Sequence, residues 1–171
     1  MIDRRTVLTG LGAASVLAIG GADAAPKAAG GDLFERFIEI INAWKKHDID
    51  AVLSRVSDDI VWYAYVGVAP IVGKPAMRTM LEKMAPNRSA ERWRLFNHAI
   101  NGNVLFVEGV DDWDDAAGHR LEVPYCGIVE FKNGLVTGWR DYFDIGTLNA
   151  MKAGGPVPAE ILPLVSRTGR P

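Results

Sequence analysis

The sequence lacks several features that mark particular classes of protein, and each shortage narrows the range of functions. Among 171 residues there is one cysteine, Cys126, so an internal disulfide is impossible. The 19 lysines and arginines are outnumbered by 21 aspartates and glutamates, and the net charge of −2 argues against a basic nucleic-acid-binding surface. We therefore expect a globular protein without a nucleic-acid partner.

Motifs for metals, phosphates and nucleophilic serines are also missing. The histidines have no ligand spacing with one another or with the cysteine, so we expect no metal site. The sequence has neither a glycine-rich phosphate loop nor a serine in a nucleophile elbow, and we expect no cofactor. Cys126 is interpreted as a small core residue.

The only long apolar run, residues 7–19, lies near the N-terminus and is too short to span a bilayer. Arg4 and Arg5 precede it, and "GGADAAP" follows with small residues at the positions that a signal peptidase recognises. The paired arginines before Thr-Val-Leu resemble the twin-arginine export signal of bacteria. We predict a signal peptide at 1–25, a periplasmic or secreted mature protein, and no stable membrane insertion after processing.

Beyond the signal, the sequence predicts one folded domain. Residues 26–31 form a linker, residues 32–151 carry the periodic apolar segments, and residues 152–171 form a tail with several prolines and glycines. Apolar residues at helical spacing predict three helices in the first half of the domain, at about 32–44, 51–56 and 74–84, and a short helix at 145–151 precedes the tail. Asp50 is the predicted cap of the second helix.

The second half of the domain has the alternation and turn signals of strands. A meander of four antiparallel strands is predicted, with turns at 101–102, 116–117 and 132–134. Helices followed by such a meander predict an α+β fold, a curved antiparallel sheet that the N-terminal helices cover to form a cone with one apolar pocket.

Three segments carry a resemblance to a known superfamily: "AWKKHDIDAVLSRVSDDIVWY", "NGNVLFVEGVD" and "NGLVTGWRDYFD". The chain resembles the nuclear-transport-factor-2-like proteins, which include SnoaL-like polyketide cyclases and ketosteroid isomerases. Within them it is most similar to limonene-1,2-epoxide hydrolase. This resemblance implies one-step epoxide hydrolysis by two aspartates, an arginine between them, and a tyrosine and an asparagine that hold the water.

Carried onto this sequence, the two aspartates match Asp111 and Asp141. The arginine position is Gly109, which departs from the family pattern. The tyrosine position falls on Trp62, or on its neighbour Tyr63 under a shift of one residue. The asparagine position falls on Ala64, or on Tyr65 under the same shift.

The residues themselves also favour a carboxylate pair. Two carboxylates in one apolar pocket cannot both ionise cheaply, so one becomes an acid and the other a base. The turn at 116–117 places Tyr125 opposite Gly109, and the turn at 101–102 places Arg94 there as well. Asp111, Asp141, Tyr63 and Tyr125 are therefore our candidate catalytic residues. Arg94 is a candidate charge partner if the even residues of its strand face inward, although Trp93 and Leu95 look more like the inner face.

The candidate substrate-binding residues share an apolar or aromatic side chain near the predicted pocket. They are Trp62, Ala64, Tyr65, Met80, Met84, Trp113 and Phe143.

The sequence leaves several alternatives open. Asp111 begins an acidic run that a solvated turn would also explain, and Asp141 could be a structural carboxylate. The expected partner is a small apolar molecule, and the favoured function is an epoxide-hydrolase-like enzyme. An isomerase or cyclase of the same fold, or a non-catalytic periplasmic binder, would use the same pocket. A homodimer is compatible with the resemblance, but the sequence leaves the oligomeric state open.

Overall fold

The computed structural model describes residues 30–170, with side chains from Leu33 onward, so the predicted signal and most of the linker lie outside it. The first helix, α1 (Gly30–Trp44), buries a stripe of large apolar residues that includes Phe37 and Ile41. It therefore begins slightly before the predicted start at residue 32. Among the described residues, no helix is long and apolar enough to cross a membrane.

Two further helices follow α1. The helix α2 (Ile49–Leu53) is capped by the Asp48 side chain, which accepts a hydrogen bond from the Ala51 N–H at 2.9 Å. It starts and ends earlier than the 51–56 expected, because Asp48 rather than Asp50 provides the cap. The helix α3 (Lys74–Met84) has the predicted bounds, with a proline in its first turn.

One sheet of seven strands forms the other half of the fold. Its strands are β1 (Val56–Tyr63), β2 (Ile71–Val72), β3 (Arg88–Ser89), β4 (Arg94–Asn101), β5 (Val104–Asp115), β6 (Arg120–Lys132) and β7 (Leu135–Tyr142). The path runs β2-β1-β7-β6-β5-β3, and β4 pairs with β5. The meander β4 to β7 is antiparallel as predicted, whereas β1 joins β7 in parallel.

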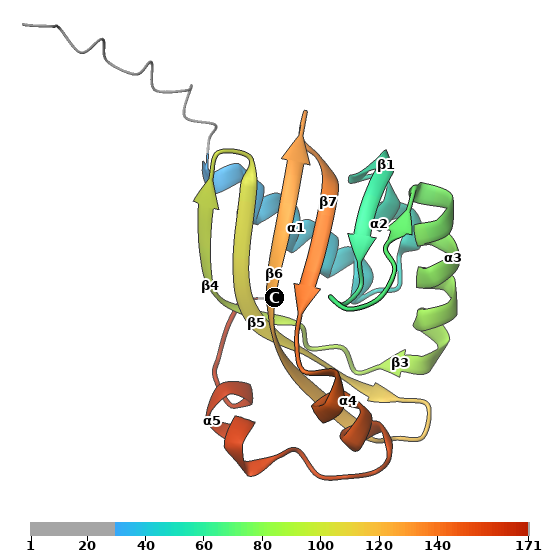
Figure 1. Cartoon of the computed structure of the whole chain (residues 1–171), viewed down its shortest axis with the longest axis vertical. Helices are drawn as coiled ribbons and strands as arrows, with labels where there is room; N and C mark the ends of the chain where they lie inside the picture. The colour runs from blue at the N-terminus through green and yellow to red at the C-terminus, as the bar shows by residue number, and fades with distance from the viewer. Residues whose placement is uncertain (1–29, 171) are drawn as a thin grey trace, which may run out of the picture.

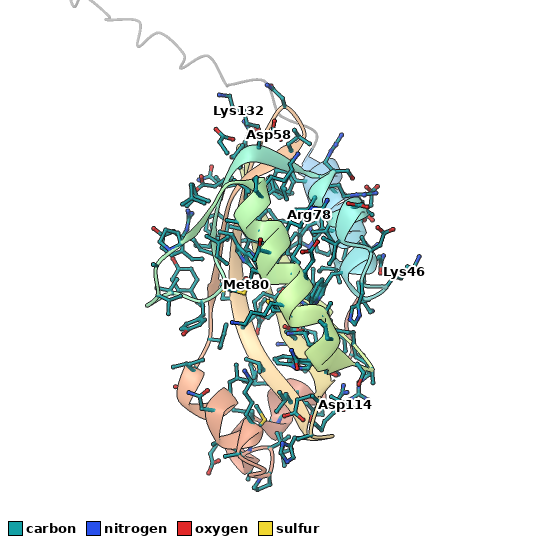
Figure 2. All side chains as sticks on the ribbon, turned by 90° about the vertical axis from the view of Figure 1, so that its right-hand side faces the viewer. Lys46, Asp58, Arg78, Met80, Asp114 and Lys132 are labelled. Carbon is teal, nitrogen blue, oxygen red and sulfur yellow. The ribbon has the colours of Figure 1, made fainter. Side chains whose placement is uncertain are left out.

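The helices cover one face of the curved sheet. Figure 1 shows α1 running behind the strands, with α3 beside β1, and Figure 2 shows α3 in front of the sheet after a quarter turn. The helix α4 (Ile145–Lys152) lies below the end of β7, against the β5–β6 hairpin, and packs its Leu148 and Met151 against Trp113, Leu121 and Val123. This arrangement confirms the α+β cone.

Two strand registers decide which side chains face the helices. The β5–β6 hairpin pairs Gly109 with Tyr125, as predicted. The β4–β5 register is different from our prediction, because the turn lies one residue later and β4 is irregular between Leu95 and Asn97. Arg94 therefore stands opposite Val110, and Leu95 takes the place opposite Gly109.

The position of Cys126 on the outer face of β6 differs from our prediction. Cys126, predicted in the core, is exposed, since it follows the inward-facing Tyr125 and successive strand residues alternate in direction.

The C-terminal segment also packs on the domain. After α4 it forms a short 3-10 turn, Ala159–Ile161, and the helix α5 (Leu162–Val165). Arg170 then pairs with Leu95 through two backbone hydrogen bonds of 2.7 and 2.9 Å, and its side chain bonds Glu35 of α1.

Candidate active site

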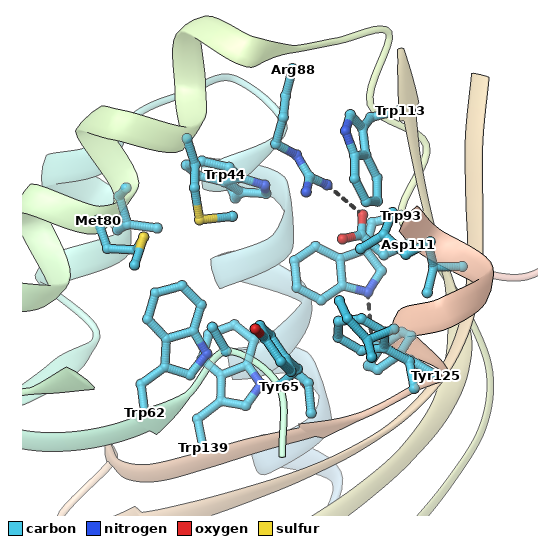
Figure 3. A pocket seen from close by; sticks show the side chains of 18 of the residues that line it. Trp44, Trp62, Tyr65, Met80, Arg88, Trp93, Asp111, Trp113, Tyr125 and Trp139 are labelled. Atoms are coloured by element: carbon cyan, nitrogen blue, oxygen red, sulfur yellow. Dashed lines mark hydrogen bonds and ion pairs between the residues drawn. The ribbon is translucent and has the colours of Figure 1, made fainter. Parts of the chain in front are cut away.

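A cavity of about 400 Å³ lies between the helices and the inner face of the sheet. This volume is in the range of about 300–1,000 Å³ that is usual for small-molecule sites. Its walls come from α1, α2, α3 and α4 and from strands β1, β3, β5, β6 and β7, and most of the lining side chains are aromatic or aliphatic (Figure 3). All seven candidate substrate-binding residues line it: Trp62, Ala64, Tyr65, Met80, Met84, Trp113 and Phe143.

Three of the four candidate catalytic residues also line this cavity. Asp111 of β5, Tyr125 of β6 and Asp141 of β7 face it from neighbouring strands. Tyr63 does not line it, because Trp62 points inward and the next residue of a strand points the other way. The prediction that Tyr63 is a catalytic residue of this cavity is therefore corrected, since Tyr63 lies outside its lining.

Asp111 is held by an arginine that the sequence pattern did not reveal. Arg88 of β3 donates from Nη2 to Asp111 Oδ1 at 2.7 Å, which Figure 3 shows as a dashed line. The Arg88 side chain is 7% exposed, and its guanidinium carbon lies 3.6 Å from the centre of the Trp113 ring. Burial acts to lower the pKa of Arg88, but Asp111 and Glu91 overcome it, and the pKa lies above its ordinary value. Arg88 is thus a fixed cation at one wall of the cavity.

Gly109 could not carry the arginine that the family pattern places there. A Cβ atom at this position would lie 2.2 Å from the Arg94 carbonyl oxygen, so β4 passes too close for any side chain. Arg88 supplies a cation to Asp111 from a different strand.

Arg94, the expected charge partner, serves another cluster. Its Nη2 bonds Asp112 Oδ2 at 2.8 Å, and its guanidinium also donates to the carbonyl oxygens of Arg167 and Val165. Asp112 points away from the cavity, and it is fully buried between Arg92, Arg94 and Arg120. Arg94 is therefore not the charge partner of the catalytic carboxylates, because it faces the same side of the sheet as Asp112.

Asp141 has a different environment from Asp111. It is 8% exposed, and the Trp139 indole donates to its Oδ1 at 2.9 Å. Burial raises the pKa of Asp141 to about 8, the indole hydrogen bond opposes this rise, and the negative charge of Asp111 adds to it. At neutral pH the Asp141 carboxyl is therefore protonated.

A second indole lies near the same carboxyl. The Trp62 indole acts to lower the pKa of Asp141. Among the described residues, however, the Trp62 Nε1 has no hydrogen-bond partner of normal geometry. A buried donor without a partner is costly. An oxygen atom of a ligand in the cavity could accept this hydrogen bond.

Tyr125 completes the polar floor. The Trp93 indole donates to its hydroxyl oxygen at 2.6 Å, which leaves the phenol proton for another acceptor. Burial, and then the charge of Asp141, keep the pKa of Tyr125 well above 10. Gly127 makes room for this group, because a Cβ there would lie 3.1 Å from the Tyr125 ring and 3.3 Å from Asp141 Oδ1.

The fold and this cavity define a nuclear-transport-factor-2-like cone with a polar floor. Residues 34–153 match the limonene-1,2-epoxide hydrolase catalytic domain, so the chain belongs to that family.

Named relatives agree with this assignment. Epoxide hydrolase EphG of Mycobacterium tuberculosis is 30% identical over 105 residues, which is 61% of this chain and 68% of the relative. The structure of an M. tuberculosis LEH-like epoxide hydrolase matches with a TM-score of 0.66 and 26% identity, covering 80% of this chain and 99% of that one. A putative polyketide cyclase of Xanthomonas campestris shares the fold at a TM-score of 0.64 and 18% identity, covering 72% and 99% of the two chains.

Proposed function

We propose that the protein hydrolyses the epoxide of a small apolar molecule, with Asp141 as the acid and Asp111 as the base. The observation that supports this most is the contrast between the two carboxyls. Asp141 is buried among indoles and keeps its proton, whereas Asp111 is ion-paired with Arg88. Two titratable groups held in opposite states are what acid–base catalysis requires.

The reaction balances with these groups alone. Asp141 gives its proton to the epoxide oxygen as one C–O bond breaks. A water molecule forms the new C–O bond to the opened carbon and gives a proton to Asp111, and the product is a vicinal diol. Exchange with solvent then returns the proton from Asp111 to Asp141.

Other groups of the floor assist this step. The indole N–H of Trp62 and the phenol of Tyr125 are donors that can orient the water or the epoxide oxygen. Arg88 fixes the orientation of Asp111 and supports its negative charge. The apolar walls exclude bulk water and favour a hydrophobic substrate.

The test is hydrolysis of a panel of cyclic epoxides in ¹⁸O-labelled water. The wild type should place one label in the diol, and its rate should fall as pH rises through about 8, because Asp141 then loses its proton. Asp111→Asn and Asp141→Asn should each lower kcat by roughly 10²–10⁴-fold. The matched control is Asp114→Asn, which removes a carboxylate of the same acidic run outside the cavity.

An isomerase or cyclase is the second candidate. The specific observation in its favour is that Trp62 and Ala64 occupy the positions where the family pattern has its water-holding tyrosine and asparagine. Such an enzyme needs an acid and a base but no bound water. Product without label, whose formation still requires both aspartates, would favour this candidate over hydrolysis.

A further inference from the structure

Glu91 is a buried carboxylate that does not line the cavity, and it contacts the arginine that does. It lies between β3 and β4, with Oε1 2.7 Å from Arg88 Nε and Oε2 3.0 Å from Arg88 Nη2. The Glu91 and Arg88 side chains are 3% and 7% exposed. This two-point contact fixes the plane of the guanidinium as well as its position.

Arg88 is thereby shared between two carboxylates. The same Nη2 that bonds Glu91 also donates to Asp111, at 2.7 Å. With both acids ionised, the Glu91–Arg88–Asp111 set has one positive and two negative charges. Its net charge is therefore −1, and Asp111 is the member of the set whose negative charge acts on Asp141.

We propose that Glu91 is a positioning residue of this site, which holds Arg88 in one orientation and offsets its charge so that Asp111 remains an effective base. The proposal rests on the hydrolysis proposed above. Without Glu91, the full charge of Arg88 would act on Asp111 and would weaken its attraction for the water proton. The Arg88 side chain would also be free to turn toward the second carboxyl, Asp141.

Other charged groups face Glu91 from the elements around it. His47, between α1 and α2, has its Nε2 3.7 Å from Glu91 Oε1. Lys45, directly after α1, and Arg120 of β6 interact with Glu91 at longer range. None of these forms the two-point contact that Arg88 makes, so removal of the Glu91 charge acts mainly on Arg88 and, through it, on Asp111.

The experiment compares Glu91→Gln with Glu91→Asp. Glutamine keeps the shape but removes the charge, and aspartate keeps the charge but shortens the reach. We expect Glu91→Gln to lower kcat at least tenfold while KM changes less than twofold, because Glu91 does not touch the substrate. Glu91→Asp should lower kcat through lost geometry alone.

A second readout needs no substrate. Tryptophan fluorescence against pH, with the Asp141→Asn curve subtracted, follows the Asp141 carboxyl that Trp139 bonds. The midpoint, near 8 in the wild type, should fall measurably in Glu91→Gln, because the charge of Arg88 is then no longer offset by Glu91 and favours the ionised form of Asp141. It should stay in place in Glu91→Asp. The control is Glu39→Gln, which removes the carboxylate of the exposed Arg55–Glu39 pair and should change neither readout.

Several results would overturn the proposal. An unmoved midpoint and an unchanged kcat in Glu91→Gln would show that Arg88 is held without Glu91. A lower melting temperature with both readouts intact, or failure of both variants to fold, would make Glu91 a purely structural residue. If the wild type hydrolyses no epoxide, the proposed function fails by itself, and the midpoint still decides whether Glu91 controls the charge at this site.

Discussion

Because Asp141 is protonated in the folded protein, it should make the free energy of unfolding depend on pH. The substitution Asp141→Asn should remove this contribution. In the folded protein its pKa is raised from 3.8 to about 8, mainly by burial. Between these values the folded state binds a proton that the unfolded state has lost. The stabilisation that Asp141 contributes to the folded state is therefore fully present below about pH 4. It is lost progressively as the pH rises from there to the folded pKa of about 8.

The slope follows from this linkage. One bound proton changes the free energy of unfolding by about 1.4 kcal/mol per pH unit. Between pH 5 and pH 7 the wild type should therefore lose roughly 3 kcal/mol that Asp141→Asn retains. Asn is a suitable replacement because it stays neutral and keeps an oxygen for the hydrogen bond from the Trp139 indole.

The assay is urea unfolding of both proteins at half-unit pH steps from pH 5 to pH 9. The quantity to compare is the difference in unfolding free energy, since groups common to both proteins cancel in it. We expect this difference to shift in favour of Asp141→Asn as the pH rises and to level off above about pH 8. Parallel curves would refute the reasoning, because Asp141 would then titrate alike in the folded and unfolded states.

Three further predictions concern the pocket, the sheet and the export signal. Small terpenoid-sized apolar molecules should quench tryptophan fluorescence with saturation and raise the melting temperature; a broad screen without either effect would argue against an open pocket. Gly109→Ala should destabilise the fold by about 2 kcal/mol or more, because the new Cβ meets the Arg94 carbonyl oxygen, and a melt within one degree of wild type would contradict this close approach. Replacing Arg4 and Arg5 by lysine should leave uncleaved precursor in the cytoplasm, whereas normal periplasmic accumulation would argue against a twin-arginine route.

Sequence reasoning predicted the pocket wall well where the pattern was local. Strand alternation placed Trp139 and Asp141 on one face of β7, and both are buried there. The same rule, applied to β1, excludes Tyr63 once Trp62 is known to face inward. The predicted β5–β6 register also holds, because the turn is short: residues 116–118 separate Asp115 from His119, which pair through their backbone, and a tight hairpin determines which residues are opposite.

The register of β4 could not be obtained in the same way. Its turn lies one residue later than the Asn-Gly pair indicated, and the strand is irregular before Asn97. Such a change of register alters which residue lies opposite a given side chain and on which face of the sheet that side chain lies. Arg94 was thereby placed opposite Gly109 as a candidate charge partner, although it bonds Asp112 on the outer face of β5.

The sequence by itself determined the α+β cone, the two aspartates of the floor and the aromatic character of the walls, because each depends on periodicity or on a short motif. The tertiary structure alone decided the charges of the site. Arg88 reaches Asp111 across 23 positions from a two-residue strand, and no sequence spacing indicates that contact. The state of Asp141 likewise depends on how deeply the fold buries it, since desolvation comes from atoms that are distant along the chain.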